Sequence, residues 1–192
     1  MTTGVRGVGV DIVDLGAFAA SLAEPGTRLT RAFSPTERRQ CRERAEARGA
    51  GRAAGFTSSS PSSSTSASPA SSSPAASSPP GMSSPPGTVT PRRHEDPLAR
   101  HLAARWAAKE AVIKAWSAAL YGMPPPIPPD LLRWAEIETV CDAWGRPTVR
   151  LGGEVARQVA ATLGDDTRWN VSLSHDGGSA IAFVVLEGPL RG

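Results

Sequence analysis

Small and branched apolar side chains alternate along an early stretch of the chain, VRGVGVDIV. This period of two predicts a strand, with three branched residues on one side, Val8, Val10 and Ile12. The other side carries Gly7, Gly9 and Asp11. Because glycines add no bulk beside the acid, a ligand has room to approach the Asp11 carboxylate. An edge strand with a solvated aspartate explains this stretch alone equally well.

Two later stretches carry helix-start signals followed by helical sequence. The first begins in FSPTERRQ, where Ser34 is the expected N-cap and Glu37 completes a capping box. This helix is expected to run toward Gly49. The second begins with Asp96 as its cap and continues for about six turns until Gly122 and a proline-rich segment stop it.

Beyond these helices the pattern changes to short strands and one more helix. WAEIETV and PTVRL are expected strands, joined by a hairpin with Gly145 in its turn. GGEVARQVAATLG is an amphipathic helix, and WNVSLSH and SAIAFVVLE form a final hairpin around Asp176, Gly177 and Gly178. The order of strand, helix, long helix, two strands, helix and two strands indicates an α+β fold with a mostly antiparallel sheet.

A low-complexity segment interrupts this pattern. Residues 57–88 are nearly all Ser, Pro, Ala, Thr and Gly, carry no charge and include one large apolar side chain, Met82. Such a segment buries too little apolar surface to offset its ordering entropy, which predicts a disordered insertion at about 53–91. The flanking pieces, about 1–52 and 92–192, suffice for one packed core, so residues 1–192 are expected to form a single interrupted domain.

Composition narrows the classes of function. The formal net charge is only +3, and the cluster of arginines between residues 38 and 52 is interrupted by glutamates. This cluster suits a solvated helix or a positive face for an acidic protein or a phosphate-rich ligand. No nucleic-acid partner is expected, because the aromatic residues are not interleaved with the basic ones.

The cysteines and the hydropathy indicate the cellular compartment. Cys41 and Cys141 lie far apart and match no metal-ligand spacing. The N-terminus lacks a signal-peptide core, and no apolar run reaches the length of a membrane span. A cytoplasmic protein with reduced thiols and no membrane contact is therefore expected.

The only two lysines of the chain, Lys109 and Lys114, stand on either side of Glu110. Lysine is a mobile point charge that suits phosphate oxygens, and Glu110 and Lys114 share one helix face. A surface ion pair is the structural alternative. Four alanines are expected to form a stripe against which another backbone packs closely, at Ala103, Ala107, Ala111 and Ala118.

Carboxylates from separate elements suggest a metal site. If Asp11 and Glu110 meet, they form a common arrangement for Mg²⁺, which takes its remaining ligands from water and substrate phosphates. His175 and Asp176 are expected at an exposed hairpin rim, where His175 alone is also explained as an ordinary turn residue. His94 and His101 are expected to face solvent.

Three motifs in this order resemble one family. GVGVDIVDL, RWAAKEAVIKA and NVSLSHDGGSAIAFVV, with FSPTE between the first two, are similar to the holo-acyl-carrier-protein synthases. These enzymes are the small members of the 4′-phosphopantetheinyl transferase superfamily. The resemblance covers about 1–48 and 96–187, and KAWS and WGRP look most like the actinobacterial branch.

The resemblance implies a fold, a reaction and a site. The fold is an antiparallel sheet packed against a long helix. The reaction moves the 4′-phosphopantetheine arm of coenzyme A to a serine of apo-acyl carrier protein and releases 3′,5′-adenosine bisphosphate. Asp11 and Glu110 match the Mg²⁺ ligands, and Lys114 matches the lysine that reaches the phosphates of coenzyme A. A homotrimer with coenzyme A bound between subunits is also implied.

Other positions follow with less direct matches. Arg105 and His175 match family positions at the coenzyme A site, and Lys109 is expected to flank the same phosphates. Arg31 matches a basic position that meets the acidic carrier protein. Asp176 is a candidate for metal binding or for the general base.

The chain also departs from the family. The glycine-rich turn that follows the long helix in many relatives is replaced by SAALYGMPPPIPP, where Ser117 is expected to begin a substitute phosphate contact. A Mg²⁺-dependent transferase of another phosphate ester and a non-catalytic carrier-protein-binding relative are the two competing hypotheses.

Overall fold

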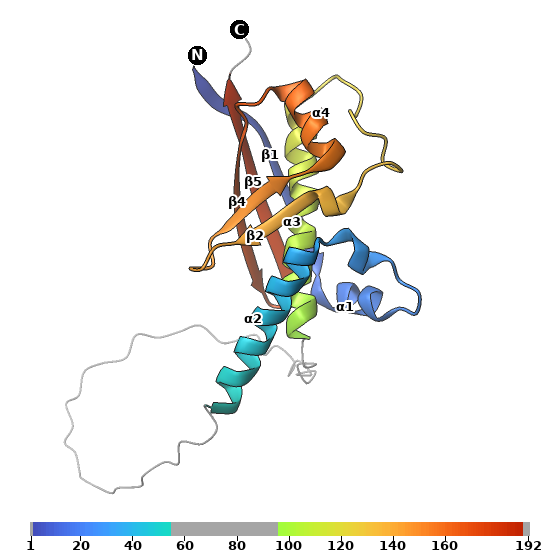
Figure 1. The fold of residues 1–192 in the computed structure, drawn as a ribbon, viewed down its shortest axis with the longest axis vertical. Helices are drawn as coiled ribbons and strands as arrows, with labels where there is room; N and C mark the ends of the chain where they lie inside the picture. Colours follow the sequence, from blue (N-terminus) through green and yellow to red (C-terminus); the bar gives the residue numbers. More distant parts are fainter. Residues whose placement is uncertain (1, 55–95, 190–192) are drawn as a thin grey trace, which may run out of the picture.

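A long helix, α3 (Pro97–Ala119), lies along one face of a three-stranded sheet (Figure 1). The structure is a computed structural model that describes residues 2–54 and 96–189. The sheet has the order β1-β5-β4 and is antiparallel throughout; its strands are β1 (Thr3–Asp14), β4 (Arg168–Asp176) and β5 (Ser179–Pro189). The predicted α+β class with an antiparallel sheet against a long helix is confirmed.

Shorter elements surround this pair of layers. A second antiparallel sheet contains β2 (Ile137–Cys141) and β3 (Pro147–Leu151). The remaining helices are α1 (Leu15–Ala23), α2 (Pro35–Ala54), α4 (Gly153–Leu163) and the 3₁₀ turns η1 (Leu29–Ala32) and η2 (Trp134–Glu136). The predicted insertion at 53–91 lies outside the described residues except for its first two positions, which continue α2. His94 also lies outside them.

Local signals explain where the two predicted helices begin. The Ser34 hydroxyl accepts from the Glu37 N–H at 3.1 Å, and the Glu37 carboxylate accepts from the Ser34 N–H at 2.9 Å. This reciprocal pair is the predicted capping box at the start of α2. The Asp96 carboxylate likewise accepts from the Leu98 N–H at 2.9 Å and caps α3. The helix α2 runs past the expected end at Gly49 to Ala54.

The predicted hairpins are also present. Gly145 (φ 89°) lies in the β2–β3 turn, and Gly177 (φ 54°) and Gly178 (φ 90°) form the β4–β5 turn. These positive φ angles favour glycine over residues with a Cβ. One local prediction was wrong, because Trp134 begins a 3₁₀ turn rather than a strand. The helix α1, capped by Asp14, is a further element for which no prediction was made.

The core lies between the sheet and the shorter elements, with α3 at its centre. Thirteen residues of α3 are buried, and they pack against inner-face residues of β5 such as Ala182, Val184 and Leu186. The outer face of the sheet instead exposes apolar side chains, among them Val8, Val10, Ile12, Ile181 and Phe183. We call these five residues the outer sheet face. Among the described helices, none has the length and apolarity needed to cross a membrane.

Candidate active site

Close packing of β1 on α3 brings the N-terminal strand to the middle of the long helix. A Cβ added at Gly7 would lie 2.0 Å from the Ala115 carbonyl oxygen, and one at Gly9 would lie 1.9 Å from that of Ala111. Side chains cannot occupy these positions without moving the two backbones apart. The glycines therefore make room for the helix, which corrects the prediction that they clear space for a ligand.

The predicted alanine stripe is correct at three of its four positions. Ala103, Ala107 and Ala111 are fully buried, whereas Ala118 is exposed. Ala115, three residues earlier, takes the place that was expected for Ala118 against the strand. The small residues of α3 and β1 thus match each other, and this match fixes where Asp11 lies along the helix.

Asp11 lies next to the contact between β1 and α3, beside the exposed flank of the helix. The Lys114 ammonium donates to the Asp11 carboxylate at 2.8 Å and to the Val10 carbonyl at 3.0 Å. The side chain of Lys114 is 51% exposed and that of Asp11 is 17% exposed. Partial burial and the nearby Asp11 charge raise the pKa of Glu110, and Lys114 opposes this rise. The three side chains therefore form one electrostatic cluster.

Asp11 and Glu110 both line an open cavity of about 430 Å³ between β1, α1 and α3. We call it the carboxylate cavity. Trp106 and Phe18 give it an apolar wall, and Asp14, also at its edge, is engaged in capping α1. Within the described residues, no three His, Cys, Asp or Glu side chains form a metal-binding group. A metal held here would therefore need ligands from substrate or water in addition to two carboxylates.

The structure contradicts the prediction for Lys109. Its side chain is fully buried, and its ammonium donates to the Glu37 carboxylate at 2.8 Å and to the backbone carbonyls of Trp134, at 3.1 Å, and Ile137. Burial lowers the pKa of Lys109, and the Glu37 charge opposes that effect. The ammonium is directed into the core, so Lys109 is not available to bind a phosphate at the surface.

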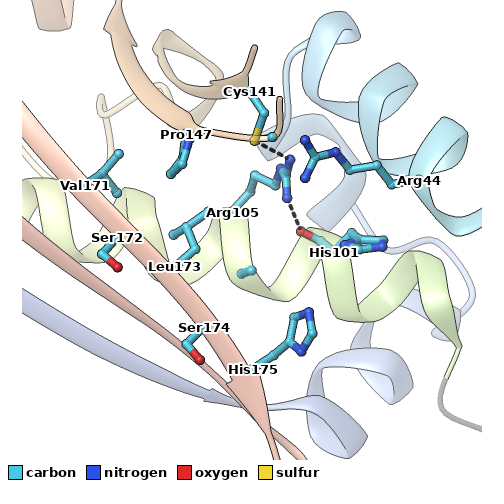
Figure 2. A pocket seen from close by; sticks show the side chains of 12 residues that line it. Arg44, His101, Arg105, Cys141, Pro147, Val171, Ser172, Leu173, Ser174 and His175 are labelled. Atoms are coloured by element: carbon cyan, nitrogen blue, oxygen red, sulfur yellow. Dashed lines mark hydrogen bonds between the residues drawn. The ribbon is translucent and has the colours of Figure 1, made fainter. Parts of the chain in front are cut away.

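A second cavity, of about 360 Å³, lies on the other side of α3 between α2, the β2–β3 hairpin and β4. It brings together Arg105 and His175, two of the residues predicted to bind coenzyme A (Figure 2). The guanidinium of Arg105 is buried and donates to the His101 carbonyl and the Cys141 sulfur, both at 3.4 Å. We call this the basic cavity.

Two further basic residues of this cavity were not among those predicted to bind coenzyme A. Arg44 reaches it from α2, and Figure 2 shows its side chain pointing toward Arg105. His101, which was expected to face solvent, is only 5% exposed and lines the cavity. Its position four residues before Arg105 was the available signal, because residues with this spacing share one helix face.

Three further predicted residues lie at the surface. Asp176 is exposed at the end of β4 and lines neither cavity. The structure thus does not place it with Asp11 and Glu110, as a metal or base role requires. Ser117 is exposed on α3, one turn beyond Lys114, and Arg31 is exposed in η1 just before α2. Both positions are accessible to a partner.

Comparisons with known proteins show the family to which the chain belongs. The family profile described as the 4′-phosphopantetheinyl transferase superfamily matches residues 88–184, which include Glu110, Lys114 and His175. A holo-[acyl-carrier-protein] synthase of Mycobacterium ulcerans is 38% identical over 184 residues, covering 96% of this chain and 98% of the relative. The synthase of Mycobacterium tuberculosis is 37% identical over 186 residues, covering 97% and 99%.

Solved structures give the same result. The Chronobacterium ammoniagenes ACPS-CoA complex aligns with a TM-score of 0.65 at 34% identity, covering 97% of each chain. The acyl carrier protein synthase of Mycobacterium tuberculosis aligns with a TM-score of 0.56 at 31% identity, covering 97% of this chain and 100% of the other. The similarity therefore extends over both pieces of the chain that flank the undescribed segment.

Proposed function

The chain belongs to the 4′-phosphopantetheinyl transferase superfamily as a holo-[acyl-carrier-protein] synthase, and on that premise we propose that Asp11 and Glu110 hold the Mg²⁺ for its reaction. The enzyme transfers the 4′-phosphopantetheine arm of coenzyme A to a serine of apo-acyl carrier protein. The other product is 3′,5′-adenosine bisphosphate. The observation that carries the metal proposal is the shared cavity of the two carboxylates beside Lys114.

The chemistry of the two carboxylates fits a divalent cation. The pKa of Glu110 is raised, first by partial burial and then by the charge of Asp11. The two carboxylates therefore repel each other, and a cation between them would relieve this repulsion. Mg²⁺ favours a few carboxylate ligands supplemented by phosphate oxygens. Held by Asp11 and Glu110, it would offset part of the negative charge of the coenzyme A pyrophosphate.

The surrounding side chains position the substrates. In the reaction the serine hydroxyl loses its proton to a general base, and its oxygen forms a bond to the phosphorus that carries the pantetheine arm. The bond from that phosphorus to the bridging oxygen breaks, and this oxygen stays on the 5′-phosphate of the departing bisphosphate. Negative charge grows on the departing bisphosphate, which nearby cations stabilise. We assign that stabilisation to Lys114, which is exposed on α3 and has a long mobile side chain.

The basic cavity is the proposed place for a phosphate of coenzyme A. Arg105 and His175 line it, and no carboxylate is among its lining residues. Exposed Ser117, one turn beyond Lys114, is proposed as a further phosphate contact in place of the glycine-rich turn of many relatives. Exposed Arg31 is proposed as a contact for the acidic carrier protein.

A homotrimer is the proposed assembly. The outer sheet face exposes Ile12 by 66%, Val10 by 49% and Phe183 by 46%, and a face of this kind favours burial against another protein surface. We propose other copies of this chain as its occupants. Sedimentation analysis checks this: the wild type should be trimeric, and Val10→Glu should dissociate it. A monomeric wild type would contradict the assembly. A cytoplasmic location stays a prediction of the sequence.

Intact-mass spectrometry tests the proposed function. Apo-acyl carrier protein is incubated with the full chain and coenzyme A, in Mg²⁺ or in EDTA. The proposal predicts the mass gain of one phosphopantetheine arm in Mg²⁺ and none in EDTA. An arm gained equally in EDTA would overturn the metal assignment. No gain with either fatty-acid or polyketide carriers would favour a non-catalytic carrier-binding protein.

A further inference from the structure

The basic cavity contains more positive charge than its predicted residues supply. Its basic side chains come from three elements: Arg44 on α2, His101 and Arg105 on α3, and His175 on β4. No Asp or Glu lines it. A cavity with two arginines, two imidazoles and no counter-charge favours an anion, and phosphate offers oxygen acceptors to several donors at once.

The burial of Arg105 distinguishes this cavity from a group of basic side chains at the surface and favours a bound ligand. Its side chain is 2% exposed, and it forms none of the ion pairs found among the described residues. Its Nε has no hydrogen-bond partner in the described structure. Burial of a guanidinium without an ion pair costs free energy, and an anion bound in the cavity offsets this cost.

His101 stands against His175 inside this cavity. The two ring centroids are 6.2 Å apart and the ring planes are inclined by 71°, so one imidazole presents its edge to the other. Figure 2 shows the His175 ring pointing toward the part of α3 that carries His101 and Arg105. Both rings therefore meet at one end of the cavity, and both belong to regular elements that hold them in place.

We propose that His101 is a further coenzyme A-binding residue, and that its imidazole and that of His175 bind the same phosphate group. The inference rests on the proposed function and adds a residue to its site. His101 contributes a ring nitrogen to the phosphate, and Arg44 and Arg105 supply the permanent charge around it. Its place one turn before Arg105 puts both side chains on the cavity side of α3.

The test compares His101→Phe with the wild type, because phenylalanine keeps a ring at this position but removes both nitrogens. The dissociation constant for coenzyme A, measured by calorimetry, is expected to rise about tenfold, as for loss of a hydrogen bond to a charged group. The KM for coenzyme A should rise by a similar factor, and the KM for the carrier protein should not change. A melting temperature close to that of the wild type establishes that the fold is intact.

A double variant sharpens the test. If both imidazoles bind one phosphate, His101→Phe and His175→Phe together should weaken coenzyme A binding by less than the product of the single effects. His101→Phe with wild-type affinity for coenzyme A would overturn the inference. So would single effects that multiply without any coupling.

The outcomes separate this inference from the proposed function. A wild-type enzyme that binds coenzyme A and modifies the carrier, alongside a His101→Phe variant of equal affinity, would remove the inference alone. A wild-type chain that neither binds coenzyme A nor modifies a carrier would overturn the proposed function and the inference with it.

Discussion

The two lysines of α3 each form an ion pair with a carboxylate from another element, and the two pairs have equal N–O distances but different surroundings. Lys109 binds Glu37 and Lys114 binds Asp11, each with an N–O distance of 2.8 Å. Both side chains of the first pair are fully buried, whereas in the second they are 51% and 17% exposed. The distance between the charges thus says nothing about their role, which depends on the groups that surround them.

The inner pair is fully enclosed by hydrogen bonds. Besides Lys109, the Glu37 carboxylate accepts from the backbone N–H groups of Ser34 and Thr139, both at 2.9 Å. Lys109 in turn donates to the backbone carbonyls of Trp134 in η2 and of Ile137, the first residue of β2. The pair therefore joins the start of α2, the middle of α3 and the strand β2, and it has no capacity left for a ligand.

The outer pair is only partly satisfied. Lys114 has two acceptors, Asp11 and the Val10 carbonyl, and the neighbouring Glu110 has a raised pKa from partial burial and the Asp11 charge. A metal ion and phosphates can supply the missing partners of charged groups that are only partly paired at a cavity. The comparison separates the charges that hold the fold from those that we propose for the reaction.

The largest expected effect breaks the inner pair. Lys109→Met leaves the Glu37 charge buried without its cation, which should lower the free energy of unfolding by about 3–5 kcal/mol. Lys114→Met removes an exposed pair and should lower it by less than about 1 kcal/mol. Urea denaturation of the two matched variants measures both. Equal losses in the two variants would contradict the difference between the pairs.

The next effect removes one charge of the outer site. Asp11→Asn or Glu110→Gln should reduce the rate of transfer by about 10²–10⁴-fold, because several kcal/mol of charge stabilisation are lost. Stability should change little, since both side chains reach the surface cavity. The matched control is Asp165→Asn, an exposed aspartate between α4 and β4. Steady-state assays of carrier-protein modification decide, and wild-type rates in either site variant would refute the assignment.

A smaller effect tests the contact that sets the position of Asp11. Gly9→Ala places a Cβ against the Ala111 backbone and should cost about 1–3 kcal/mol of stability through overpacking. Displacement of β1 should also weaken transfer, although no charge is altered. Gly16→Ala is the control, because its Cβ would meet only the Asp14 side chain, at 3.3 Å. Thermal unfolding and transfer assays should show losses for Gly9→Ala alone.

The smallest effect exchanges one cation for another at the outer site. Lys114→Arg keeps the charge but replaces a mobile ammonium with a planar fork, and a loss of about tenfold in kcat/KM is expected from the poorer fit to phosphate. Stability should be unchanged. An arginine variant with full activity would mean that only the charge at this position matters.

The sequence predicts those elements of the structure whose signals are local. Ser34 and Glu37 lie three residues apart and form their capping box, and the paired glycines after Asp176 mark a turn that the hairpin has. The residue types and the resemblance to a family predicted that Asp11 and Glu110 lie at one site. The structure then placed both of them at one cavity.

Long-range partners explain what the sequence did not reveal. Lys109 is the neighbour of Glu110, but its acceptors lie 72 residues before it and 25 and 28 residues after it. Its inward direction depends on how α2 and β2 pack against α3. The roles of Gly7 and Gly9 depend on the same kind of contact, as does the burial of His101 against a strand near the C-terminus.

The most direct measurement is the binding of Mn²⁺, a spectroscopic substitute for Mg²⁺, followed by electron paramagnetic resonance in the presence of coenzyme A. The account predicts metal binding in the wild type and in Asp165→Asn. It predicts affinity at least about tenfold lower in Asp11→Asn and Glu110→Gln, from the loss of a charged ligand. Wild-type Mn²⁺ affinity in both site variants would show that the outer carboxylates do not hold the metal.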